Sequence, residues 1–176
     1  MAQISLSSNT GVSPWRTRTG SPRIMTLQGA STAASTATIK VGNVVQFDVT
    51  STSLHRLVRA STGVTAIVST TIAGVAAGAF SPDGASASTA SISVWVADGN
   101  TEFKFPTKIA GTTPELLGTL MSLEFDSSLA IHYLRANSTA ADQRVRITQV
   151  IDAGDTNGYV AGVFISSACS PAVCQR

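Results

Sequence analysis

Short hydrophobic runs, separated by small or polar residues, follow one another along most of this chain. The runs are rich in Val, Ile, Thr and aromatic residues, which favour strands, and the residues between them favour turns. They comprise residues 23–27, 39–49, 54–60, 65–72, 90–97, 101–106, 119–125, 129–135, 144–152 and 159–165. Many short strands at regular spacing are typical of a sandwich or a barrel. We therefore predict an all-β fold, a single antiparallel β-barrel or sandwich domain with an extended irregular N-terminal arm.

The clearest local pattern predicts a hairpin near the C-terminus. Val145 and Ile147 alternate with Arg144 and Arg146, so one strand face should be buried and the other wet. The Asn157-Gly158 pair that follows suits a tight turn into the run 159–165.

A second hairpin is predicted at residues 94–106, "VWVADGNTEFKFP", where a turn-forming Asp-Gly-Asn separates two aromatic runs. Aromatic side chains beside such a turn fill a core or pair across strands more often than they stack on a ligand. We expect that role for Trp95, Phe103 and Phe105.

Few segments have a helical pattern, and the chain divides by composition into three parts. Residues 113–118 and the Ala-rich 30–38 are the helical candidates, and both are too short for a stable helix. Residues 1–22 show no regular period and are interrupted by glycines and prolines. We predict an extended arm at 1–22 that the fold can do without, a β domain at 23–166 and a C-terminal tail at 167–176.

The charge content indicates a protein that associates with others. Charged residues make up 12% of the 176 residues, about half the usual fraction, so little repulsion keeps copies apart. Residues 1–60 hold six basic residues and one acidic residue, whereas 61–176 hold six basic and nine acidic ones. We predict an assembly component that forms a dimer or a trimer. The sequence has no apolar run of membrane length and no signal-peptide pattern at its start, so we expect a cytoplasmic product without a membrane partner.

Residues with catalytic chemistry form no recognisable motif, and we predict that the protein is not an enzyme. His55 and His132 each lie within a strand pattern, and no Gly-x-Ser-x-Gly sequence accompanies them, so we expect hydrogen-bonded rings within the sheet. Glu124 and Asp126 share one strand face, which we consider as the acid pair of a glycosidase, but they stand closer than an inverting pair usually does. We interpret them as solvent-facing acids.

The sequence predicts neither a metal nor a cofactor. Asp152 and Asp155 lack the spacing and the closing Glu of a calcium loop, and turn formation explains them. Cys169 and Cys174 are expected as reduced thiols in the tail, with a small disulfide ring as the alternative. No phosphate-binding or dinucleotide-binding glycine motif is present.

The arm contains the candidate binding residues, Trp15, Arg16, Arg18 and Arg23. Three arginines neutralise few phosphates, so nucleic acid would bind only weakly, and we predict no nucleic-acid partner. We expect the arm to lie across an acidic protein surface instead. Trp15 would be the buried anchor, and the arginines would pair with carboxylates of a neighbour.

Taken together, the basic arm, the series of strands and the segment "VWVADGNTEFKF" resemble the capsid cement (decoration) proteins of tailed bacteriophages. That family has a strand, an Ala-Asp turn, an Asn-Thr pair and a Phe-containing strand, which match Ala97-Asp98, Asn100-Thr101 and Phe103. The order of strands and polar loops in residues 120–165 is also similar to the family. The resemblance covers about residues 23–166, and the segments on either side have no clear counterpart.

The resemblance implies binding without catalysis. A cement protein is a structural virion protein that binds the outer surface of a phage head and stabilises contacts between major capsid protein subunits. This chain would then be assembled in the host cytoplasm and located on the capsid exterior. Two alternatives stay open: another virion part, such as a head fibre or a tail component, and a carbohydrate-binding module that uses Trp95 with Glu124 and Asp126.

Overall fold

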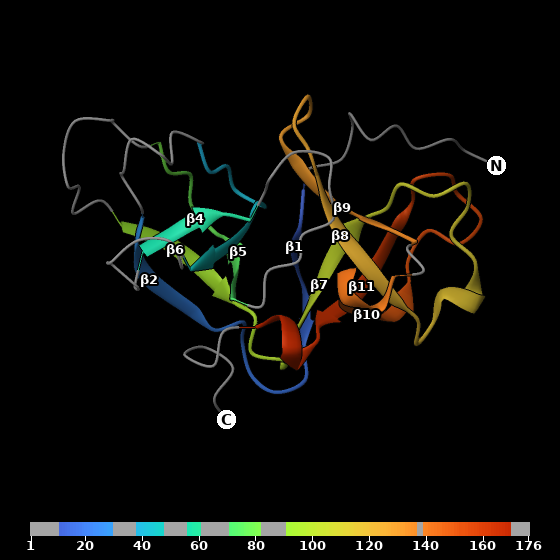
Figure 1. The fold of residues 1–176 in the computed structure, drawn as a ribbon. Helices are drawn as coiled ribbons and strands as arrows, with labels where there is room; N and C mark the ends of the chain where they lie inside the picture. Colours follow the sequence, from blue (N-terminus) through green and yellow to red (C-terminus); the bar gives the residue numbers. More distant parts are fainter. Residues whose placement is uncertain are drawn as a thin grey trace.

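The computed structural model describes residues 11–29, 38–47, 56–60, 71–81, 91–136 and 139–169, with the backbone alone for 56–58. These segments contain eleven strands and three single turns of 3-10 helix, which confirms the all-β prediction (Figure 1). The helical turns are η2 (Pro114–Leu116), η3 (Ala140–Asp142) and η4 (Ser166–Ala168). No helix in this part of the chain has the length and hydrophobicity needed to cross a membrane.

The strands form two sheets that lie side by side in Figure 1. The order in the six-stranded sheet is β1 (Ser13–Thr17), β7 (Thr101–Pro106), β11 (Tyr159–Phe164), β10 (Gln143–Val150), β8 (Leu120–Asp126) and β9 (Ile131–Arg135). The order in the five-stranded sheet is β2 (Ile24–Gly29), β4 (Arg56–Arg59), β3 (Val44–Phe47), β5 (Ile72–Ala76) and β6 (Ser91–Val96). All pairings are antiparallel except that of β2 with β4. This short parallel pairing closes the five-stranded sheet into a small ring.

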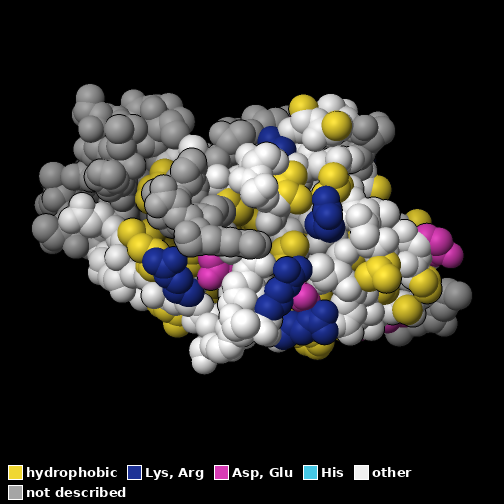
Figure 2. All heavy atoms as spheres, turned by 90° about the horizontal axis from the view of Figure 1, so that it is seen from below, with side chains coloured by type: hydrophobic (Ala, Val, Ile, Leu, Met, Phe, Trp, Pro, Cys, Tyr) yellow, Lys and Arg dark blue, Asp and Glu magenta, His cyan; other side chains and the backbone are white. Residues whose placement is uncertain are grey.

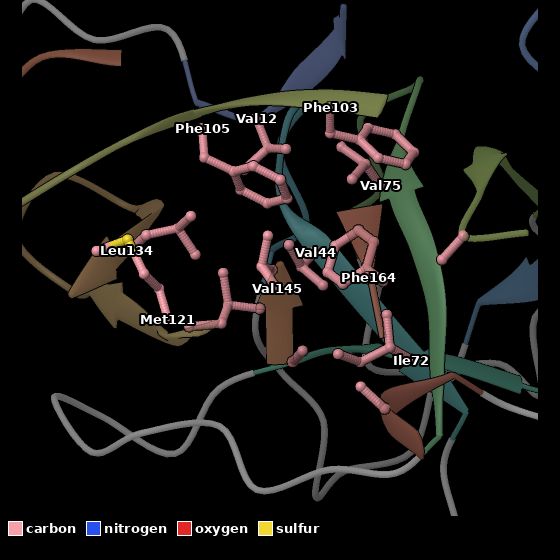
Figure 3. Close-up of a cluster of buried hydrophobic side chains, with 14 of the residues drawn as sticks. Val12, Val44, Ile72, Val75, Phe103, Phe105, Met121, Leu134, Val145 and Phe164 are labelled. Atoms are coloured by element: carbon pink, nitrogen blue, oxygen red, sulfur yellow. The ribbon is translucent and has the colours of Figure 1, made fainter. Parts of the chain in front are cut away.

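One hydrophobic core joins the two sheets. Phe164 packs edge-to-face on Phe103 and Phe105, with ring centroids 5.5 Å apart in both pairs. Side chains of the five-stranded sheet, among them Val44 and Val75, point into the same cluster (Figure 3). The two sheets therefore make one sandwich-like domain and not a single closed barrel.

A second hydrophobic cluster lies within the five-stranded sheet. On β3, Val44 joins the shared core while Val45 joins this second cluster, because successive side chains point to opposite faces. β5 is buried on both faces in the same way, so all five of its residues are buried. The sequence prediction ended this strand at residue 72, because Ala and Gly are poor strand formers. Residues 65–70 of the predicted strand lie outside the described residues.

The predicted irregular arm is wrong for residues 13–17, which form β1 and pair with β7. Val12 is buried in the shared core, 1% exposed, and its N–H donates to the carbonyl of Gly42 at 3.1 Å. Residues 1–10 lie outside the described residues. Pro14 and a register shift before Arg16 hid the strand, because both interrupt the alternation that predicts one.

The hairpin predicted at residues 94–106 is a corner between the sheets. β6 belongs to the five-stranded sheet and β7 to the six-stranded sheet, so the two strands do not pair. The Asp98 carboxylate accepts the N–H groups of Asn100 and Thr101, at 2.9 and 3.1 Å, which turns the chain. Phe103 and Phe105 lie in the core as predicted.

The C-terminal hairpin of β10 and β11 is confirmed, but its turn is longer than expected. Residues 151–158 connect the strands, and the Asp152 carboxylate accepts the N–H of Tyr159 at 3.0 Å. Asn157 has a φ of 55°, in the left-handed region that Asn tolerates. Arg144 was expected on a wet face, yet it is only 6% exposed.

The start of the predicted tail is part of the fold. Ala168 and Cys169 are buried, and the backbone of Cys169 forms an isolated parallel β-bridge with Ile72 of the five-stranded sheet. Cys169 is therefore held against the core and not in a loose tail. Cys174 lies outside the described residues, so the choice between thiols and a disulfide stays a prediction.

Candidate interaction surface

Aromatic and charged side chains lie together on the outward side of β1, β7, β11 and β10. On β7, Phe103 and Phe105 point into the core, so Glu102 and Lys104 lie on the opposite side. We call this surface the Trp15 face. Its residues, connected by the contacts described below, are Trp15, Arg16, Glu102, Lys104, Thr148, Gln149 and Tyr159.

Trp15 is held in place but remains 42% exposed. Its indole N–H donates to the side-chain oxygen of Gln149 at 3.4 Å. The Lys104 ammonium lies 3.9 Å from the ring centroid of Tyr159 and 5.9 Å from that of Trp15. Such cation–π contacts contribute about 0.5–1 kcal/mol each at exposed sites. A large aromatic ring is thus oriented on a rigid sheet while much of it faces water.

Arg16, next to Trp15, is already paired within the chain. Its Nε donates to Glu102 Oε2 at 2.6 Å, and its Nη2 donates to Oε1 at 3.3 Å. The Thr148 hydroxyl donates to the same carboxylate at 3.1 Å, and the Glu102 side chain is only 5% exposed. A two-pronged arginine–carboxylate pair is among the stronger polar contacts in proteins. Arg16 therefore already has a carboxylate partner within its own chain, and its predicted pairing with a neighbour stays a prediction.

The four predicted binding residues do not form one site. Arg18 follows β1, and its backbone N–H donates to the carbonyl of Asn100 at 3.1 Å. Arg23 precedes β2, and its carbonyl accepts the N–H of Val96 at 2.9 Å. Neither side chain makes an ion pair within the described part of the chain. Trp15 and Arg16 lie on the Trp15 face, whereas Arg18 borders a pocket considered below.

His132 fastens the two sheets together and is not placed as a catalytic base. Its ring is fully buried, Nδ1 accepts the N–H of Val44 at 3.1 Å, and Nε2 contacts the carbonyl of Ala60 at 2.6 Å. Burial, helped by the nearby Arg59, lowers the pKa of His132 to about 3, although the contact with the Ala60 carbonyl acts in the opposite direction. The ring is therefore neutral, with the proton on Nε2. The predicted hydrogen-bonded role is confirmed for His132, while His55 lies outside the described residues.

Glu124 was expected to face solvent, and this expectation is wrong. Glu124 is only 5% exposed, and its carboxylate accepts a hydrogen bond from the Tyr133 hydroxyl at 2.7 Å. Arg135 approaches the same carboxylate at 3.7 Å. Burial raises the pKa of Tyr133 well above its usual value, and the hydrogen bond to Glu124 adds to this effect. This carboxylate is held in a structural network within the sheet.

Asp126 stabilises the turn after β8. Its Oδ1 accepts the hydroxyl of Ser128 and the N–H groups of Ser128 and Leu129. The Ser128 hydroxyl makes the largest contribution to lowering the pKa of Asp126. Trp95, the third residue of the carbohydrate alternative, is partly buried against the shared core from the other sheet. Glu124 and Asp126 are thus engaged within the chain, and Trp95 belongs to the other sheet.

The described residues contain no cluster of three His, Cys, Asp or Glu side chains that could hold a metal ion. Asp152, considered as a calcium ligand, uses its carboxylate to close the β10–β11 loop instead.

No protein-family model matches this chain, and neither a curated protein nor a solved structure matches it. Family membership therefore remains an expectation from the sequence. The fold and the Trp15 face are the features on which a function can be proposed.

Proposed function

We propose that this protein is a non-enzymatic virion protein of the cement (decoration) type. It binds the outer surface of a phage head and stabilises contacts between major capsid protein subunits. The observation that carries this proposal is Trp15, a large aromatic side chain that is 42% exposed and oriented by Gln149 and Lys104. Exposed, preorganised tryptophans are typical anchors of protein interfaces. The low charge content and the family resemblance support the same function.

The groups around Trp15 lower the cost of bringing a partner onto this surface. Covering an unpaired charge is expensive, but Glu102 is already neutralised by Arg16 and bonded to Thr148. The Lys104 ammonium lies over Tyr159 and retains that contact when water is removed. A partner with a hydrophobic pocket can therefore cover Trp15 without leaving the Glu102 carboxylate unpaired, while Lys104 keeps the Tyr159 ring as a partner.

A cement protein works by contacting several capsid subunits at once. Each contact needs only modest affinity, because a second contact from the same assembly forms at a high effective concentration. A dimer or a trimer of this chain would present two or three copies of the Trp15 face on one symmetry axis. The particle is then held against the outward pressure of packaged DNA by contact energy alone.

The test uses phage heads assembled without this protein, to which the purified protein is added. We expect the wild-type protein to bind and a cryo-EM map to show it on the outside of the shell. Trp15→Ala should weaken binding at least tenfold, because truncating an anchor costs about 2 kcal/mol or more.

Trp95→Phe is the matched control, since Trp95 packs partly buried against the core of the other sheet. It should bind like the wild type. The proposal is overturned if the wild-type protein does not bind, or if Trp15→Ala binds equally well. Density on a tail or on a head fibre would assign the protein to that structure instead.

A further inference from the structure

A pocket of about 340 Å³ lies where β1, the β6–β7 corner and the end of β11 meet. Arg18, Asp98 and Arg146 are among its lining residues, and Phe164 and Ile165 provide an apolar part of the wall. The pocket adjoins the Trp15 face, because Arg146 lies two residues before Thr148 on β10. It is therefore placed where a partner covering Trp15 would also reach it.

The positive charge at this pocket is not used within the described part of the chain. Arg18 and Arg146 are both exposed, and neither makes an ion pair there. Arg16 and Arg135, in contrast, approach the buried carboxylates of Glu102 and Glu124. Two exposed arginines on one pocket, neither of which makes an ion pair within the described residues, are the arrangement that binds a carboxylate or a phosphate.

The shape and charge of the wall favour a carboxylate carried by a protein. Asp98 also lines the pocket, and its negative charge partly offsets the charges of the two arginines. Its Oδ1 accepts the N–H groups of Asn100 and Thr101. A nucleic acid would need a longer row of cations. Val163 and Ile165 are half-buried and offer an apolar contact beside the charge, whereas the side chain of Phe164 belongs to the shared core.

Figure 1 places η4 and the β1–β2 connection, which leads away from Arg18, on the lower side of the molecule. Figure 2 looks at that side and shows several basic side chains with few acidic ones between them. Hydrophobic side chains also reach this surface. The charge of this face thus complements an acidic partner.

We propose that this pocket binds an acidic peptide segment of a partner protein, with Arg18 and Arg146 pairing with one carboxylate side chain. An apolar side chain next to that carboxylate contacts Val163 and Ile165. The identity of the partner as a capsid subunit rests on the proposed function, whereas the chemistry of the pocket does not. Arg18 thus keeps the pairing role that the sequence predicted for Arg16, Arg18 and Arg23, and Arg146 is a pairing residue that the sequence did not indicate.

The direct test is an NMR titration of the full-length, isotope-labelled protein with a short probe peptide, acetyl-Gly-Leu-Glu-Phe-Gly-amide. Saturable shifts are expected for the amides of the β6–β7 corner and of residues 163–166 and for the side-chain N–H signals of Arg18 and Arg146. The same peptide with Gln in place of Glu should bind at least fivefold more weakly. Arg18→Gln and Arg146→Gln should each weaken binding to a similar extent.

Arg23→Gln is the matched control, because Arg23 is an exposed arginine that does not line the pocket. It should leave the titration unchanged, and an unchanged amide spectrum of each variant shows that it is folded. Equal binding of the Glu and Gln peptides, or unchanged binding by both pocket variants, overturns the inference. The inference is also overturned if the full-length protein does not bind the Glu peptide and a variant lacking residues 170–176 does. In that case the chain's own C-terminal segment would occupy the pocket.

Binding to phage heads separates this inference from the proposed function. If Arg18→Gln and Arg146→Gln bind heads like the wild type while Trp15→Ala does not, the cement function stands and the pocket has no part in it. If the wild-type protein binds no heads but takes the Glu peptide in the pocket, the pocket stands and the cement function fails.

Discussion

Two arginines that lie two positions apart have different surroundings, and so different effects on stability are expected. Arg16 pairs with the buried Glu102, whereas Arg18 reaches a solvent-exposed pocket. Arg16→Ala should lower the free energy of unfolding by about 1–2 kcal/mol, because it leaves a buried carboxylate with only Thr148 as a side-chain partner. Arg18→Ala should change it by less than about 0.5 kcal/mol. Urea unfolding at neutral pH measures both values, and equal losses would show that the Arg16–Glu102 pair does not stabilise the fold.

His132 gives the protein a dependence on pH. The pKa of His132 is about 3 in the folded state, against an ordinary value of 6.5. Between these two pH values the imidazole therefore binds a proton in the unfolded chain but not in the folded chain. The contribution of neutral His132 to the free energy of unfolding is therefore fully present above pH 6.5, and it is lost as the pH falls from there toward 3. Between pH 6 and 5, where carboxylates are still mostly ionised, the loss should be about 1 kcal/mol per pH unit.

The measurement is the free energy of unfolding at several pH values in this range. His132→Gln should flatten the slope even if it lowers stability overall, while His55→Gln should keep it. A slope that disappears with His55→Gln and persists with His132→Gln would contradict this assignment.

Individual side chains were predictable where only alternation mattered. Phe103 and Phe105 follow the period of a strand and lie in the core as expected. The burial of Glu102 was not predictable, because its partner Arg16 lies 86 positions away in the sequence. The burial of Glu124 was missed because Tyr133, which binds its carboxylate, comes from the neighbouring strand β9, and the sequence pattern does not give the register of β8 and β9.

At the scale of elements, part of the segment that the sequence predicted as an arm is strand β1 of the six-stranded sheet. Removing residues 1–17 would expose the hydrogen-bonding edge of β7, leave Glu102 without Arg16 and take Val12 out of the core. We expect a loss of at least about 3 kcal/mol in the free energy of unfolding, together with aggregation. This replaces the expectation from the sequence that the segment 1–22 is dispensable for folding.

Urea unfolding and light scattering of the truncated protein test this prediction. Arg16→Ala is the reference, since it removes the ion pair and keeps the strand. A truncated protein as stable as the full chain would show that β1 is only an attached arm.

The sequence indicated most strands but could not assign them to sheets. β7 has the bounds that the pattern predicted, because its alternation is regular and a turn precedes it. The same turn was consistent with a hairpin and with a corner, since Asp98 makes the same local hydrogen bonds in both. The partner of a strand depends on packing between distant segments.

At the scale of the molecule, the shared core predicts that both sheets unfold together. The chain has two tryptophans, and they lie in different sheets, Trp15 on β1 and Trp95 on β6. In Trp15→Phe and in Trp95→Phe the remaining tryptophan therefore reports on one sheet. Within each variant, the urea midpoints from fluorescence and from far-UV circular dichroism should coincide. Two separated midpoints in either variant would show that the sheets are independent units.

The register of β1 on β7 has a further consequence for how this architecture can vary. Thr17 pairs with Thr101, so the chain leaves the six-stranded sheet and returns at the neighbouring position. Residues 18–100, with the whole five-stranded ring, are topologically an insertion into a hairpin of β1 and β7. Because the two ends of the insertion are adjacent, its length can change without altering the register of the host sheet. Loops of this unit can therefore lengthen or shorten while the ring still supplies Val44, Ile72 and Val75 to the shared core and the surface around Trp15 stays the same.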